Sequence, residues 1–205
     1  MCGIVGYLGK QDATKILING LKRLEYRGYD SAGIGIIGEK LQVFKEIGEI
    51  SMLQHSIPKI KGNLGIGHTR WATHGKVSKE NAHPHLSCDK KIAVVHNGII
   101  ENFKTLREEL ENKGHIFTSQ TDSEVIIHLI EEEYKGSLEQ AVSSSLKKIQ
   151  GSYAIVVICE DEPEKLVGAR KIIASMDEQD VDKSVVFGFP WMSPQLFSRC
   201  RLKTE

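Results

Sequence analysis

The first residue of this chain with clear catalytic potential is Cys2, which precedes the small residue Gly3. Initiator methionine is normally removed when the next side chain is small, so we expect Cys2 to begin the mature chain. Its free α-amine, with an ordinary pKa of about 7.7 to 8.0, could then accept the proton of its own thiol. The pattern predicts a terminal nucleophile that carries its own base. An inert terminal cysteine is the alternative.

Two later segments, residues 67–75 and 94–102, contain groups suited to binding and cleaving an amide. Each follows a predicted buried strand. Arg70 offers a planar fork that fits a carboxylate, while the Asn97 amide and the Gly98 N–H offer two donors for an oxyanion. Two alternatives remain open at this point: a surface ion pair for Arg70 and a hairpin turn for Asn97-Gly98.

Several segments, taken in order, resemble the glutaminase domain of the glutamine–fructose-6-phosphate aminotransferase family. Members of this family are class II glutamine amidotransferases and belong to the N-terminal-nucleophile hydrolase superfamily. The resemblance extends from Met1 to about Arg170 and rests on residues 2–6, 26–33, 67–75, 82–85, 94–102 and 121–124. It implies an α+β fold, a four-layer αββα sandwich, which we expect to be truncated at its C-terminal end.

The resemblance also implies a role for each matching residue. Cys2 would attack the glutamine carboxamide, form a γ-glutamyl thioester and release ammonia. Asn97 and the Gly98 N–H would form the oxyanion hole. Arg70 would bind the α-carboxylate of glutamine and Asp122 its α-ammonium group, because a zwitterionic substrate needs one fixed cation and one fixed anion.

A loop that closes over glutamine is a further implication of the resemblance. Trp71, Thr73 and His74 would belong to it, with Thr73 and His74 supplying polar contacts. The expected substrate is L-glutamine, and fructose 6-phosphate would be reached only through isomerase domains that this sequence does not show. No cofactor is expected, and a homodimer is left open.

Two other functions compete with this interpretation. One is the glutaminase of an amidophosphoribosyltransferase, which shares the N-terminal cysteine. Tyr29 and the sequence of residues 69–74 favour the fructose-6-phosphate aminotransferase family instead. The other is a non-catalytic glutamine-binding module, if the chain folds incompletely. Release of glutamate would distinguish these functions.

Composition argues against several other classes of protein. Lysine plus arginine equals aspartate plus glutamate at 27 each, so no net field favours nucleic acid or an anionic membrane. The longest apolar runs fall far below the roughly 20 residues that cross a bilayer, and no secretory signal is visible. The four cysteines do not resemble a disulfide framework. We therefore expect a cytoplasmic protein with reduced thiols.

A few polar residues have less certain roles. His83, His85 and Cys88 lie close in sequence, but no second group of ligands completes the four positions of a structural zinc site, so we predict no metal. Arg27, Tyr29 and Asp30 either shape the glutamine pocket or brace the turn between the first helix and the next strand, and bracing is the preferred interpretation.

Hydrophobic patterns predict strands and helices in an order that suits sheets packed against segregated helices. Strands are expected at residues 4–8, 34–37, 41–44, 64–68, 92–96 and 153–159. Helices are expected around Leu17 to Leu24, around Phe103 to Leu110, from near Asp122, and after a capping box at Ser137. We expect a glutaminase domain at 1–170 and a divergent tail at 171–205, to which no element is assigned.

Overall fold

The computed structural model describes residues 2–72, 75–171 and 185–188, the last as backbone only. The strands are β1 (Gly3–Leu8), β2 (Ser31–Ile37), β3 (Leu41–Ile47), β4 (Leu64–Arg70), β5 (His85–Leu86), β6 (Ile92–Ile100), β7 (Gly151–Cys159), β8 (Leu166–Lys171) and β9 (Val185–Gly188). The helices are α1 (Ala13–Lys22), α2 (Ile50–Ser56), α3 (Phe103–Asn112), α4 (Glu124–Glu133) and α5 (Leu138–Leu146), with a short 3-10 turn η1 (Glu25–Arg27).

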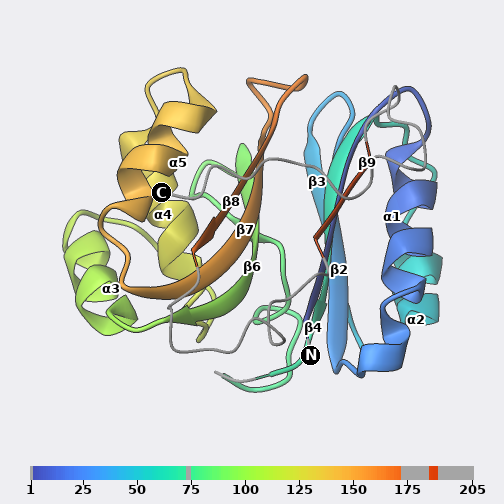
Figure 1. Cartoon of the computed structure of the whole chain (residues 1–205), viewed down its shortest axis with the longest axis horizontal. Coiled ribbons are helices and arrows are strands. Elements are labelled where there is room, and N and C mark those ends of the chain that lie inside the picture. The colour runs from blue at the N-terminus through green and yellow to red at the C-terminus, as the bar shows by residue number, and fades with distance from the viewer. Residues whose placement is uncertain (1, 73–74, 172–184, 189–205) are drawn as a thin grey trace.

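These elements form two sheets, which lie face to face between two layers of helices (Figure 1). The strand order is β3-β2-β4-β1-β9 in one sheet and β5-β6-β7-β8 in the other. Helices α1 and α2 cover the outer face of the first sheet, and α3, α4 and α5 cover that of the second (Figure 1). The predicted four-layer αββα sandwich is confirmed.

The core consists of three apolar layers, one between the sheets and one under each helical layer. Both faces of the central strands are therefore covered, and every residue of β2 and β4 is buried. Strands of this kind are apolar on both faces instead of alternating. Within the described ranges, no helix combines the length and the apolar character that a membrane crossing requires.

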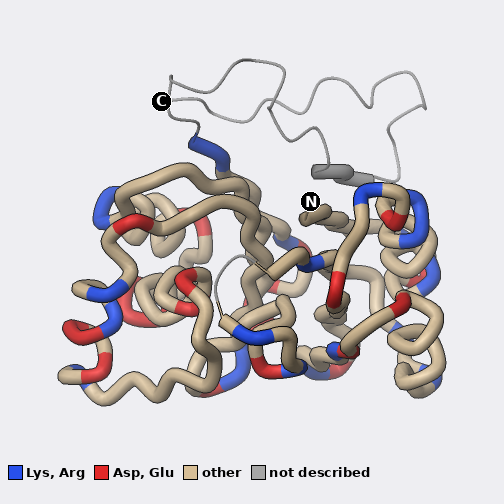
Figure 2. Tube along the Cα trace, turned by 90° about the horizontal axis from the view of Figure 1, so that it is seen from below, with Lys and Arg blue, Asp and Glu red and all other residues tan. Residues whose placement is uncertain are grey.

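Residues of both charge signs occur throughout the described part of the chain. Figure 2 shows lysine and arginine interspersed with aspartate and glutamate around the described chain. This distribution agrees with the equal numbers of basic and acidic residues.

All six predicted strands are present, and most of them extend further than the apolar runs suggested. Leu24 lies beyond the end of α1, which finishes at Lys22. The helix expected from near Asp122 is α4, which begins at Glu124. The predicted capping box at Ser137 is wrong, because its side chain makes no cap hydrogen bond and the Leu138 N–H donates to a carboxylate oxygen of Glu162 at 2.6 Å.

Four elements were not predicted: α2, β5, β8 and β9. β5 has only two residues, and β8 is only partly buried along its length, so neither presents a continuous apolar run. β9 lies in the segment for which no element was expected, and it pairs in parallel with β1, from Ile4 opposite Val185 to Tyr7 opposite Gly188. The rest of the tail lies outside the described residues.

A core substitution tests this layered packing. Ile66 is fully buried between the sheets, whereas Ile116 is 73% exposed. We expect Ile66→Ala to lower the free energy of unfolding by about 2–5 kcal/mol, because it opens a cavity in a layer that cannot collapse freely. Ile116→Ala, the matched control, should change it by less than about 0.5 kcal/mol. Urea unfolding of both variants measures the difference, and equal losses would contradict the assigned packing.

Candidate active site

The space between the sheets changes from apolar to polar along the strands. Side chains alternate between the two faces of a strand, so Leu64, Ile66, His68 and Arg70 share one face of β4. Leu64 and Ile66 belong to the apolar layer between the sheets, whereas His68 contacts Asn97 of the opposite sheet. The polar end of this layer is where the predicted site residues gather.

Cys2 lies at that polar end, immediately before β1. Gly3 pairs with Thr69 of β4, so Cys2 lies beside the end of that strand. The Trp71 N–H donates to Cys2 Sγ at 3.2 Å, and Cys2 Sγ lies 3.6 Å from the Trp71 carbonyl oxygen, which accepts from the thiol. Cys2 is only partly buried, so its sulfur is within reach of a small molecule.

Asn97 and Gly98 lie inside β6 and not in a turn, so the hairpin alternative is wrong. They pair with Ala154 and Tyr153 of β7. Asn97 Nδ2 donates to the Cys2 carbonyl oxygen at 3.4 Å, which places this amide next to the residue expected to be the nucleophile. Gly98 has φ of 133°, and a Cβ there would lie 2.2 Å from the Ser152 carbonyl oxygen, so only glycine fits.

His68 orients Asn97 and was missed by the sequence interpretation. Its Nε2 lies 2.8 Å from Asn97 Oδ1. Burial lowers the pKa of His68 to about 4, so the ring is neutral at physiological pH. Because an amide oxygen can only accept, Nε2 must carry the proton, and Asn97 Nδ2 is directed toward Cys2. The alternation that places His68 on the same face as Arg70 could have identified it.

Arg70 is buried at the end of β4, with 4% of its surface exposed, so the surface ion-pair alternative is wrong. One guanidinium nitrogen donates to the Lys76 carbonyl oxygen at 3.3 Å and lies 4.0 Å from a carboxylate oxygen of Asp30. Asp30 also accepts from the Ala72 N–H at 2.5 Å, and its own N–H donates to the Arg70 carbonyl oxygen at 2.8 Å. These contacts support a bracing role for Asp30.

Asp122 is held against the end of the strand that carries Asn97. Its Oδ2 accepts from the Ile100 N–H at 2.8 Å, and 4% of the residue is exposed. The next residue, Ser123, has its hydroxyl 2.8 Å from His96 Nδ1, which fixes the start of α4 to β6. Asp122 and Asn97 therefore belong to one rigid unit.

The loop at residues 75–81 joins the segments of Arg70 and Asp122. Asn81 Nδ2 donates to the same Lys76 carbonyl oxygen at 2.8 Å, and Asn81 Oδ1 accepts from the Gln120 N–H at 2.8 Å. Trp71 is 53% exposed. Thr73 and His74, which were predicted to take part in a closing loop, lie outside the described residues.

Four buried histidines surround the site, but they add no positive charge to it. His68 stacks on His83 with ring centroids 4.2 Å apart, and the His96 N–H donates to His83 Nδ1 at 3.1 Å. Burial lowers the pKa of His96 to about 4 and the pKa of both His83 and His85 well below the ordinary value. These rings act as neutral hydrogen-bonding groups that fix the polar end of the sandwich.

The three residues considered for a metal site separate in the structure. His83 packs within the histidine group, and His85 Nε2 lies 3.0 Å from the Thr121 hydroxyl. Cys88 contacts a different set of side chains, described below, which come from segments far along the chain.

A model of the glutamine amidotransferase domain matches residues 68–176 of this chain. The chain belongs to this family. It is 50% identical to the isomerising glutamine–fructose-6-phosphate aminotransferase of Methanococcus maripaludis, over 83% of this chain and 30% of that protein. The enzyme of the same name from Pyrococcus horikoshii is 54% identical, over 83% of this chain and 29% of that protein.

A solved structure with this fold is the glutamine phosphoribosylpyrophosphate amidotransferase of B. subtilis, complexed with ADP and GMP. Its TM-score is 0.71 and its identity 32%, over 83% of this chain and 37% of that one. This likeness to an amidotransferase agrees with the N-terminal-nucleophile hydrolase fold. The chain spans about 30% of the length of the curated relatives it matches.

The buried histidines predict a loss of stability in mild acid. An unfolded histidine takes up a proton near its ordinary pKa of about 6.5, whereas His68 and His96 stay neutral in the folded state down to about pH 4. The unfolded state therefore binds more protons in this window, and the free energy of unfolding falls as the pH drops from about 6.5 toward 4. Urea unfolding across that range measures the decline.

A variant with one fewer buried histidine provides the comparison. His68→Gln should be less sensitive to pH, because one of the mismatched groups is gone. His55→Gln, at an exposed position on α2, should keep the original dependence. An unchanged slope in His68→Gln would show that His68 is not held neutral.

Proposed function

We propose that this chain hydrolyses L-glutamine to glutamate and ammonia, with Cys2 as the nucleophile. It would be the ammonia-supplying part of an enzyme that makes glucosamine 6-phosphate from fructose 6-phosphate. The observation that carries the proposal is the orientation of Asn97, whose amide nitrogen is directed at Cys2 by a hydrogen bond to His68. A hydrogen-bond donor fixed next to the residue that carries the nucleophile is what acyl transfer requires.

The chemistry follows from these positions. After removal of Met1, the Cys2 α-amine takes the thiol proton, and the sulfur attacks the carboxamide carbon of glutamine. Asn97 Nδ2 and the Gly98 N–H stabilise the oxyanion of the tetrahedral intermediate. The C–N bond then breaks as the α-ammonium returns the proton to the leaving nitrogen, which departs as ammonia. Water hydrolyses the thioester to glutamate and regenerates the thiol.

Recognition of the substrate is assigned to charges at the edge of the same region. Arg70 would bind the α-carboxylate and Asp122 the α-ammonium group, and both are buried side chains fixed by backbone contacts. Fixed groups of this kind lose little entropy when the ligand binds. Trp71 would cover the methylene groups, together with the polar contacts expected from Thr73 and His74.

The relatives favour glucosamine 6-phosphate synthesis over the amidophosphoribosyltransferase alternative. The aminotransferases named above are 50% and 54% identical to this chain, whereas the phosphoribosylpyrophosphate amidotransferase is 32% identical. We extend the proposal to action in the cytoplasm and to fructose 6-phosphate as the eventual ammonia acceptor, through isomerase domains. Homodimer formation remains a prediction.

Glutamine hydrolysis by the 205-residue polypeptide tests the function directly. Every residue assigned to glutamine recognition lies between Cys2 and Asp122, so we expect glutamate and ammonia in equal amounts and no amino sugar when fructose 6-phosphate is added. Cys2→Ala should abolish the activity and retain the fold by circular dichroism. Intact-mass spectrometry should show that the active protein lacks Met1.

Each outcome of this experiment has a distinct meaning. No glutamate from a well-folded chain would favour the non-catalytic glutamine-binding module. Activity in protein that quantitatively retains Met1 would refute the terminal-amine mechanism, because a peptide nitrogen cannot act as that base. Stoichiometric amino sugar would refute the division between hydrolysis and sugar chemistry.

The two binding groups should differ in how their loss affects the kinetics. Asn97→Ala should lower kcat roughly 100-fold or more with little change in KM, because its amide stabilises charge that develops in the transition state. Arg70→Lys should mainly raise KM, because a point charge replaces a bidentate fork to the carboxylate. Steady-state kinetics of glutamate release measure both.

Matched controls are available on the surface. Asn112→Ala and Arg23→Lys make the same replacements at exposed positions and should leave both constants unchanged. If Asn97→Ala raised KM and left kcat intact, the oxyanion role would be wrong.

A further inference from the structure

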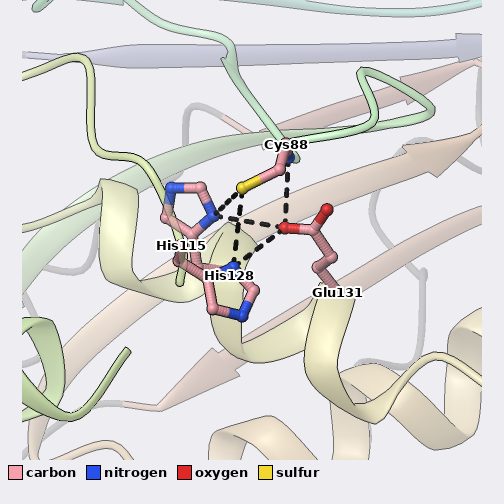
Figure 3. Close-up of side chains that lie close together, drawn as sticks. All are labelled: Cys88, His115, His128 and Glu131. Carbon is pink, nitrogen blue, oxygen red and sulfur yellow. Dashed lines mark hydrogen bonds and ion pairs between the residues drawn. The ribbon is translucent and has the colours of Figure 1, made fainter. Parts of the chain in front are cut away.

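A second group of reactive side chains lies outside the candidate active site, under the helical layer of α3 and α4. Cys88, His115, His128 and Glu131 each direct one ligand atom to a common point, and these atoms all lie within 4.8 Å of one another (Figure 3). Cys88 comes from the loop between β5 and β6, His115 follows α3, and the other two lie on α4.

Four of the six distances between these ligand atoms match the edges of a tetrahedral site. Cys88 Sγ lies 3.6 Å from the Nδ1 atoms of both His115 and His128. Glu131 Oε2 lies 3.1 Å from His115 Nδ1 and 3.3 Å from His128 Nδ1. Tetrahedral zinc bonds of about 2.3 Å to sulfur and about 2.0–2.1 Å to nitrogen or oxygen give edges of about 3.6 Å for S···N and about 3.3 Å for N···O.

The types of donor select among metals. One thiolate, two imidazoles and one carboxylate make a set that suits zinc, since magnesium and calcium require oxygen ligands. With four protein ligands the shell is closed, which is typical of structural sites; a catalytic zinc keeps one position open. His128 supplies Nδ1 from one turn of α4, and Glu131 supplies its carboxylate from the next turn. Their spacing of three residues places both side chains on one face of the helix.

A further carboxylate supports one of the imidazole ligands from behind. His115 Nε2 lies 3.1 Å from Glu132 Oε1, on the side of the ring opposite the cluster. Metal-bound histidines commonly donate their second N–H to such a carboxylate, which fixes the ring and strengthens the ligand. His115 and His128 have side chains that are 8% and 1% exposed, so neither ring can swing freely, whereas Cys88 is exposed and offers a route of entry.

From this geometry we infer that the chain binds one zinc ion through Cys88, His115, His128 and Glu131. The ion would tie three separate segments together: the loop before β6, the connection after α3, and α4. No ligand belongs to the set assigned to glutamine hydrolysis, so the role of the ion is to hold the helical layer in place.

The test is zinc binding by the full chain, in a Cys2→Ala/Cys200→Ser background that removes two other thiols able to bind the ion. We expect one zinc per chain by elemental mass spectrometry after gel filtration. Cobalt substitution should give a thiolate-to-cobalt charge-transfer band and the intense visible absorption of a tetrahedral ion. Removing the metal with a chelator should lower the melting temperature, and added zinc should restore it.

Variants of single residues identify the site. Cys88→Ser, a near-isosteric change at an exposed position, should abolish the charge-transfer band and stoichiometric binding. Glu132→Gln, which alters only the supporting carboxylate, should weaken zinc affinity about 10- to 100-fold. His55→Ala, the matched control at an exposed histidine, should change neither.

Two results would overturn the inference. One is a folded background protein that binds no zinc in a competition titration with a chromophoric chelator. The other is stoichiometric binding that survives Cys88→Ser with an unaltered cobalt spectrum. In the first case the four side chains form only a hydrogen-bonded network around the Glu131 carboxylate. In the second case zinc binds elsewhere, and His115→Gln should leave the response of the melting temperature to zinc unchanged.

Discussion

The hydrogen bond between His68 and Asn97 joins the two sheets at the point where the core stops being apolar. At 2.8 Å it connects β4 to β6 between two buried side chains. A buried amide must have its polar atoms satisfied, so the bond fixes which end of Asn97 points at Cys2. The bond forms only if the sheets are packed in this register. His68 lies two residues beyond Ile66, and Asn97 lies two residues beyond Val95; both apolar side chains belong to the layer between the sheets.

The same constraint explains why the interior contains so many histidines. A neutral imidazole provides one donor and one acceptor at little electrostatic cost, whereas a charged side chain in the same position would have to be paired. Desolvation holds the pKa of His68 and His96 near 4, so both rings remain neutral at physiological pH. In the proposed reaction, the negative charge that develops on the carboxamide would therefore meet oriented dipoles, and Arg70 would bind the α-carboxylate.

Much of this arrangement could be predicted from sequence, because it depends on short-range patterns. The apolar runs placed all six expected strands, since strands buried on both faces need nothing but continuous apolar residues. Arg70 and Asn97 were singled out by residue type, because each follows a strand predicted from the sequence. His68 was missed, although the two-residue period of β4 places it on the face of Arg70, because its role depends on a partner 29 positions away. α2 and β9 were missed because each is short and stabilised by contacts outside its own sequence.

The cluster around Cys88 could not be predicted from neighbouring residues either, because its members lie far apart in the sequence. The cluster is also connected to the candidate active site. The sequence interpretation looked for ligands near His83 and Cys88, but the side chains that meet Cys88 are 27 and 40 residues away, on elements that only the packed helical layer brings together. Two members of the cluster, His128 and Glu131, lie on α4, and the first turn of this helix is also held by hydrogen bonds. The buried carboxylate of Glu124 accepts from the Ser119 N–H at 2.7 Å and from the Ser119 hydroxyl at 2.6 Å, and its other oxygen lies 3.9 Å from His128 Nε2. One helix thus links the Cys88 cluster to the segment that ends in Asp122, so an ion bound by His128 and Glu131 would restrict the position of Asp122, the carboxylate proposed to bind the substrate.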